Sequence, residues 1–151
     1  MKPTPHELKT MQRMQPGVTT LSGFLGSDTR PLNEIIADDG AVLATLDHSQ
    51  EEIAARMESF TQASWNSYLE EILIEGKYLV QTEVYRGKMP CPFGHPGVFR
   101  KAITRLTNQV NGISVVWTSL NIHLIKAHGF FEGRDSAFRL DPQTLVSALF
   151  D

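Results

Sequence analysis

Residues 89–97, Met-Pro-Cys-Pro-Phe-Gly-His-Pro-Gly, constrain the fold more than any other stretch of the chain. They contain the only cysteine, Cys91, one of the five histidines, His95, and three of the eight prolines. Proline fixes φ and lacks an amide proton, and glycine permits unusual backbone angles, so this run can form neither a helix nor a central strand. We predict a rigid, irregular loop between two strands. Any chemical centre of the protein should include Cys91 and His95.

The composition is typical of a soluble globular protein. The chain has 151 residues, 41% apolar and 21% charged, which is enough for a single domain spanning residues 1–151. Apolar runs are short and the N-terminus has no apolar signal core, so we expect neither a membrane segment nor secretion. A single cysteine fits a cytoplasmic location, because it cannot form an internal disulfide. The net charge of −3 argues against nucleic-acid binding.

Hydrophobic periodicity predicts helices towards both ends of the chain. The first is a short helix, or a mobile arm, within residues 1–17, opened by a capping box at Thr4. Residues 31–46 are predicted to form two short helices broken at Asp38-Asp39-Gly40, because Asp39 would fall on the apolar face. The remaining helices are expected over residues 50–67, 120–127 and 143–150.

Two pairs of β-rich runs predict an antiparallel sheet of about four strands. Residues 72–74 and 78–85 flank Gly76 and form one predicted hairpin. Residues 99–107 and 113–117 flank Asn111-Gly112, a strong turn signal, and form the second. The order of helices, strands and helices predicts an α+β fold, with the Cys91 loop between the two hairpins.

Four candidate metal ligands have suggestive spacing: Cys91-x3-His95 in the loop and His123-x4-His128 on a later helix. Thiolate and imidazole are ligands that zinc prefers, and a loop pair followed by a helical pair is the order of a zinc finger, although a finger has two cysteines in its first pair. His123 and His128 lie about 140° apart around a helix, so we expect convergence only where the last turn distorts near Gly129. Zinc is the cofactor predicted for these four residues. The alternative is no cofactor, with His123 in the core and His128 facing the helix dipole.

A second hypothesis makes Cys91 a nucleophile and His95 its base. A reactive thiolate needs a base or positive surroundings, and Lys88 and Arg100 flank Cys91 in sequence. The chain has no cysteine-protease signature. The plain alternative is that Cys91 is a small buried apolar side chain.

A third hypothesis concerns partner binding. Phe130, Phe131 and Phe138, beside Arg134 and Arg139, would make an anchor cluster if exposed, but we expect these phenylalanines to be mostly buried. Charge is also uneven, since residues 28–75 are mainly acidic and residues 76–106 mainly basic. The basic part indicates either a patch for an anionic ligand or one of two oppositely charged layers.

Residues 117–133, Trp-Thr-Ser-Leu-Asn-Ile-His-Leu-Ile-Lys-Ala-His-Gly-Phe-Phe-Glu-Gly, carry a family resemblance. Together with Gly23-Phe24-Leu25-Gly26 and Pro90-Cys91-Pro92-Phe93, they resemble a family of small uncharacterised bacterial cytosolic proteins. The resemblance covers most of the chain after the N-terminal arm. It implies a bacterial, cytoplasmic protein, but it implies no activity and no functional residue.

These observations predict a binding protein rather than an enzyme. We expect a small cytoplasmic regulatory or accessory protein with a protein or small-molecule partner, able to form homo-oligomers and with or without a zinc site. The alternative is a small enzyme that uses Cys91 with a histidine. The pattern indicates no substrate.

Overall fold

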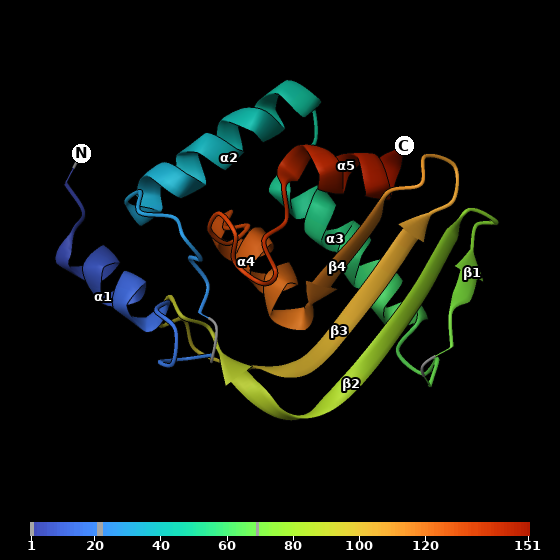
Figure 1. Ribbon diagram of the computed structural model, residues 1–151, viewed down its shortest axis with the longest axis horizontal. Helices are drawn as coiled ribbons and strands as arrows, with labels where there is room; N and C mark the ends of the chain where they lie inside the picture. Colours follow the sequence, from blue (N-terminus) through green and yellow to red (C-terminus); the bar gives the residue numbers. More distant parts are fainter. Residues whose placement is uncertain (1, 21–22, 69) are drawn as a thin grey trace.

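The computed structural model describes residues 2–20, 23–68 and 70–151. As predicted, the fold is α+β, with helices towards both ends of the chain and one antiparallel sheet between them (Figure 1). The described elements are α1 (Pro5–Arg13), α2 (Leu32–Leu46), α3 (Gln50–Ala63), β1 (Ile72–Ile74), β2 (Tyr78–Pro90), β3 (Val98–Asn108), β4 (Ser114–Thr118), α4 (Ser119–His128) and α5 (Pro142–Phe150).

The sheet is a meander in which each strand pairs with the next, in the order β1-β2-β3-β4. Both predicted hairpins are present: Ile74 pairs with Tyr78 across Gly76, and Thr107 pairs with Ser114 across the Asn111-Gly112 turn. The longest pairing joins β2 to β3 and continues to Pro90 and Val98. Residues 91–97, here called the tip loop, therefore close a third, long hairpin. The predicted loop over residues 89–97 is too long by two residues, because Met89 and Pro90 belong to β2 and pair with Phe99 and Val98.

This long hairpin bends sharply along its length (Figure 1). Val84 pairs with Ala102 and Lys88 pairs with Arg100, so three residues of β2 lie between these pairs opposite one residue of β3. Such a bulge breaks the ladder and bends the strand, and Gly87 supplies a positive φ of 101° there. The bend turns the tip loop away from the sheet, towards α1 and α4 (Figure 1).

Two apolar clusters hold these elements together, and α4 belongs to both. Ile122 and Ile125 of α4 pack in the main core with α3, α5 and the sheet. Leu120 and Leu124 face a second cluster, between α1, α2 and the tip loop. The buried members of that second cluster are Met14, Phe24, Leu25, Leu32, Ile35, Cys91, Leu120, Leu124 and Phe130.

The predicted break at Asp38-Asp39-Gly40 is wrong, because α2 is continuous from Leu32 to Leu46. Asp39 does fall on the buried side, but Arg139 pairs with both of its carboxylate oxygens at 2.6 and 2.9 Å. A buried charge with a bidentate partner is tolerated where an isolated one is not. The helix after it is shorter than predicted, since α3 ends at Ala63.

The chain ends are pinned to the body. The N-terminal segment forms a helix with Thr4 as its N-cap, and Met14 just after it is fully buried. The predicted burial of Phe130 and Phe131 is confirmed, whereas Phe138 is only half-buried. Full burial of a phenylalanine side chain stabilises a fold by about 1.5–3 kcal/mol. The two buried phenylalanines therefore fix the segment after α4 against both cores.

The Gly23-Phe24-Leu25-Gly26 segment approaches the chain's own backbone. The amide of Gly133 donates to the carbonyl of Phe24 at 2.8 Å. A Cβ added at Gly26 would lie 2.2 Å from the carbonyl oxygen of Arg134, so the site has no room for a side chain. These glycines serve close packing of two loops.

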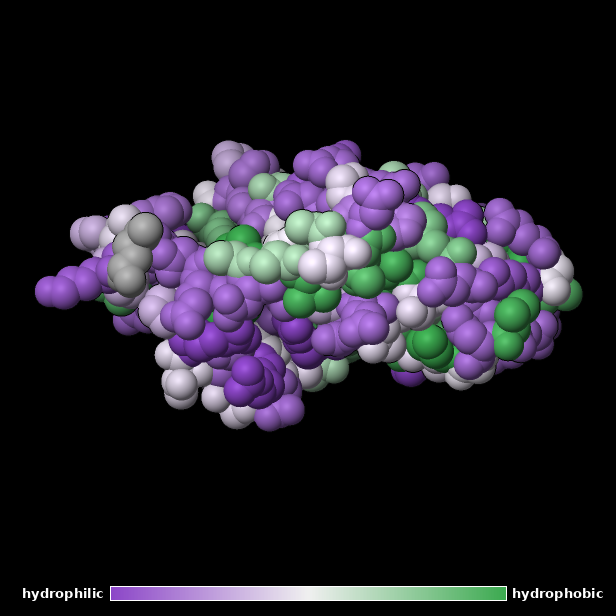
Figure 2. All heavy atoms as spheres, turned by 90° about the horizontal axis from the view of Figure 1, so that it is seen from above, coloured by the Kyte–Doolittle hydropathy of each residue, from purple (hydrophilic) through white to green (hydrophobic). Residues whose placement is uncertain are grey.

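Polar side chains cover most of the surface seen from above, and apolar atoms appear between them in small patches (Figure 2). In the part of the chain that the structure describes, no helix is long and apolar enough to cross a membrane.

Candidate metal centre

Cys91 begins the tip loop and is 3% exposed, within the second apolar cluster. A turn closed by the Gly94 amide on the Cys91 carbonyl (3.1 Å) shapes the loop. Arg13, at the end of α1, fastens it from outside, since its Nε donates to the carbonyl of Pro92 at 2.6 Å. The N-terminal helix thus positions the cysteine.

The two histidines of α4 come from a well-capped helix. Thr118 and Asn121 form a reciprocal capping box at its start. His128 is its last residue, and Gly129 follows in the left-handed conformation with φ 61°. The amides of Gly129 and Phe130 return to the carbonyls of Ile125 and Leu124, which fixes the direction of the helix end.

Cys91, His123 and His128, here called the Cys/His cluster, form a group that could hold a metal ion. One candidate ligand atom from each lies within 4.8 Å of the other two. The closest pair is Cys91 Sγ and His128 Nε2, 3.5 Å apart. Two ligands of a tetrahedral zinc ion, with bonds of about 2.0–2.3 Å, lie about 3.5 Å from each other. The closest pair therefore already has the separation of two ligands on one zinc ion.

The expected distortion of the last turn is absent, because α4 remains helical through His128. The rings of His123 and His128 nevertheless approach to 5.3 Å between centroids. Side-chain length overcomes the angular separation of the two positions. The tip loop supplies the third candidate ligand atom, Cys91 Sγ.

His95 lies beside the Cys/His cluster but does not belong to it. Its ring centroid is 5.0 Å from that of His123 and 5.6 Å from that of His128. The side chain is exposed, and its Nδ1 lies 3.1 Å from the carbonyl of Pro96. The fold therefore brings the four predicted ligands together. Candidate ligand atoms of three of them lie within 4.8 Å of one another, and His95 lies at the rim.

Aromatic rings hold the two imidazoles in place. Phe93 stacks on His128 with centroids 3.9 Å apart, and Phe99 stacks on His123 at 4.3 Å. His123 Nε2 is buried and finds no hydrogen-bond partner among the described residues. A buried polar nitrogen without a partner is costly and rare in native proteins, so this nitrogen is available to a ligand.

Burial keeps the site uncharged. It raises the pKa of the Cys91 thiol, against smaller opposing contributions from the loop amides and Arg13. Burial, assisted by the rings of His123 and His95, lowers the pKa of His128 to about 4. It also lowers the pKa of His123, with His95 and Lys126 acting in the same direction. At neutral pH both rings are neutral, which is the state in which histidine binds a metal.

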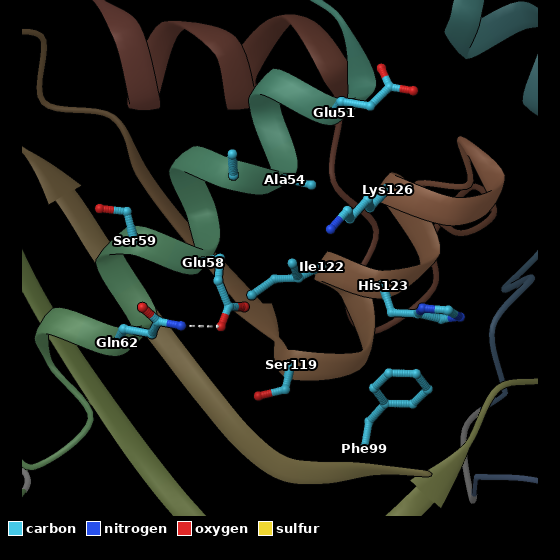
Figure 3. Close-up of a pocket in the computed structure, with 11 residues that line it drawn as sticks. Glu51, Ala54, Glu58, Ser59, Gln62, Phe99, Ser119, Ile122, His123 and Lys126 are labelled. Carbon is cyan, nitrogen blue, oxygen red and sulfur yellow. Dashed lines mark hydrogen bonds between the residues drawn. The ribbon is translucent and has the colours of Figure 1, made fainter. Parts of the chain in front are cut away.

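A groove of about 590 Å³ between α3 and α4 reaches His123. Figure 3 shows Ile122 pointing into this groove, Glu58 bonded to Gln62 on α3, and His123 extending beyond its end above Phe99. His123 is thus shared between the groove and the Cys/His cluster.

Sequence reasoning found the four candidate ligands but missed Arg13, Phe93 and Phe99, which hold the loop and the rings. No local pattern marks them, because their contacts with the site depend on the bend of the long hairpin and the packing of α1.

Comparison of the chain with protein-family models, with curated proteins and with solved structures finds no match.

Proposed function

We propose that this protein binds zinc through Cys91, His123 and His128, with His95 as the fourth ligand. A thiolate and imidazoles are a preferred zinc donor set, and structural zinc sites are four-coordinate. His95 reaches the ion by rotating away from its bond to the Pro96 carbonyl. The tip-loop glycines at positions 94 and 97, both with positive φ, give the loop around it a backbone that only glycine adopts easily.

One observation carries this proposal: the candidate ligand atoms of the Cys/His cluster converge, and one of them, His123 Nε2, is buried without a hydrogen-bond partner among the described residues. Cys91 Sγ lies 3.5 Å from His128 Nε2, which is the separation of two ligands on one zinc ion. A metal ion would use all three atoms at once. It would also remove the thiol proton, which the buried site otherwise retains.

The bound ion would cross-link the tip of the long hairpin to the end of α4. Cys91 and His123 are 32 residues apart in sequence, so the ion would stabilise the fold as well as occupy a site. This role fits a cytoplasmic accessory or regulatory protein. The groove between α3 and α4, which ends at His123, would be its surface for a ligand or partner.

Metal analysis of protein purified without a histidine tag tests the proposal. We expect about one zinc per chain, and loss of that zinc in Cys91→Ser and in His123→Ala, because each removes a ligand. His48→Ala is the matched control, since His48 pairs with Glu52 away from the cluster. Protein that neither contains zinc nor binds it in a competition titration with a chromophoric chelator would refute the proposal.

A second candidate function is nucleophilic catalysis by Cys91 with His128 as the base, in place of the predicted His95. The contact of 3.5 Å between Sγ and Nε2 favours it. The electrostatics oppose it, because burial raises the pKa of the thiol and lowers that of His128, so the charged pair is disfavoured. Rapid alkylation of Cys91 in metal-free protein below pH 8, abolished by His128→Ala, would support catalysis. Slow alkylation would count against it.

A further inference from the structure

A second candidate site lies apart from the Cys/His cluster, between the bend of the long hairpin, the start of α4 and the loop after it. A cleft of about 410 Å³ opens there, and a narrow cavity of about 80 Å³ lies behind it. The two share the lining residues Thr20, Met89, Thr118, Leu120 and Phe138. They therefore form one site with a mouth and an inner end, in the size range of small-molecule pockets.

Glu132 lines the inner end and is 3% exposed. Its Oε2 accepts from Asn121 Nδ2 at 2.7 Å, and its Oε1 accepts from Ser136 Oγ at 2.9 Å. A carboxylate offers about four acceptor sites, so these two donors leave capacity towards the cavity. Burial raises the pKa of Glu132 to about 7, a shift that is frequent at functional carboxyl groups.

The mouth has the opposite character. Arg100 and Lys101 line it, are exposed, and make no ion pair within the described part of the chain. Glu132 is the only acidic residue among the described residues that line either part. Between the two ends the walls are mainly apolar, from Met89, Ile103, Leu120 and Phe138, which explains why Phe138 is only half-buried.

We propose that this cleft binds a small amphipathic anion, with a hydroxyl or similar donor against Glu132, an apolar middle part, and a carboxylate at Arg100 and Lys101. Each part of such a ligand meets a complementary part of the wall. The site shares no residue with the four proposed zinc ligands. It stands or falls independently of the zinc proposal.

The simplest probes are ω-hydroxyoctanoate, octanoate, which lacks the inner donor, and octane-1,8-diol, which lacks the anion. Amide chemical shifts of the full chain, followed by NMR during titration, report both affinity and location. We expect saturable shifts at Ala102, Ile103, Thr118 and Leu120. The hydroxy acid should bind about tenfold more tightly than octanoate, because it adds a hydrogen bond to a buried carboxyl group.

Three variants sharpen this test. Lys101→Glu should lower the affinity for the hydroxy acid by about fivefold or more, because it reverses a charge at the mouth, and should leave the affinity for the diol unchanged. Arg86→Glu, an exposed change of equal charge outside the cleft, is the control and should have little effect. Glu132→Gln should reduce the advantage of the hydroxy acid over octanoate.

Several results would overturn this proposal: no saturable shift at these amides up to about 5 mM probe, equal affinity for hydroxy acid and octanoate, or equal weakening by Lys101→Glu and Arg86→Glu. The probe comparison on the native chain needs no variant to fold. A failure here leaves the zinc measurements unchanged, so the two proposals are tested separately.

Discussion

Two buried polar sites in this molecule differ in whether their groups satisfy one another. In the main core, Thr61, Thr82, Thr104, Ser64 and the indole of Trp117 form a network of hydroxyl contacts, here called the hydroxyl network. Thr61 lies 2.8 Å from Thr104, Thr82 lies 2.9 Å from Thr104 and 2.6 Å from Ser64, and Trp117 Nε1 donates to Thr61 at 2.9 Å. In the Cys/His cluster, by contrast, Cys91 Sγ contacts His128 Nε2 at 3.5 Å, but the buried His123 Nε2 has no hydrogen-bond partner among the described residues.

The difference is the one expected between a structural polar network and a site able to bind a ligand. A closed network of buried hydrogen bonds stabilises and orients its elements, here α3 against β2, β3 and β4, without needing anything else. A buried nitrogen without a partner, such as His123 Nε2, is instead free to accept a further group. The comparison therefore predicts opposite responses to metal and to substitution at the two sites.

The largest expected effect is stabilisation by zinc. At a free zinc concentration about a thousandfold above Kd, binding adds about 4 kcal/mol to the free energy of unfolding, which raises Tm by about 10 °C for a domain of this size. Thermal unfolding of the native chain with and without zinc measures this increase. Cys91→Ser should abolish it, and Thr61→Val should retain it, even though its starting Tm is lower. An equal increase in all three proteins would mean that zinc acts elsewhere.

The next effect is on the hydroxyl network. Thr61→Val removes the acceptor of Trp117 Nε1 and should cost about 1–3 kcal/mol of unfolding free energy, because a buried donor is left without a partner. Denaturant unfolding of metal-free protein measures it. Thr107→Val, which breaks the exposed contact with Ser114, is the control and should cost much less. Zinc affinity should be unchanged in both variants.

A smaller effect is expected at the clamp that fastens the tip loop. Arg13→Met removes the bond to the Pro92 carbonyl while keeping apolar bulk, and should weaken zinc binding by about tenfold because the loop is less well positioned. A chelator competition titration gives the affinity. Lys9→Met, an exposed change on the same helix, should leave it unaltered. Equal zinc affinities in native protein and Arg13→Met would show that the tip loop keeps its position without the Arg13 bond.

The last effect is a pH dependence in metal-free protein. The pKa of His128 falls from 6.5 to about 4 on folding, so the unfolded chain binds more protons between these values. Stability should therefore decrease as the pH is lowered from about 6.5 to about 4. His128→Gln should flatten this part of the unfolding free-energy profile, whereas Thr61→Val, which removes no titratable group, should keep the native slope. A profile unchanged by His128→Gln would contradict the burial of this ring.

Much of the fold could be predicted because its signals are local. Turn residues at Gly76 and Asn111-Gly112, and helix caps at Thr4, Ser49, Thr118 and Asp141, locate the elements directly from residue chemistry. The continuity of α2 could not be predicted, because it depends on Arg139, 100 positions away in the chain. A local pattern shows an acid on an apolar face but not the distant base that neutralises it.

The candidate site divides in the same way. The four candidate ligands could be named because thiol and imidazole are the side chains that zinc prefers. Their approach could not, since it depends on the bulge between Val84 and Lys88 and on the clamp from Arg13. Glu132 was also missed, because its burial and its bonds to Asn121 and Ser136 follow from the path of the loop after α4.

The central claim is that Cys91, His123 and His128 bind one metal ion together, and cobalt substitution tests it most directly. Cobalt(II) replaces zinc in such sites and its visible spectrum reports the ligands. We predict intense tetrahedral bands and a thiolate-to-cobalt charge-transfer band that saturates at one equivalent. Both should be lost in Cys91→Ser and retained in His48→Ala. A weak spectrum typical of hydrated cobalt, or a charge-transfer band that survives in Cys91→Ser, would contradict the account.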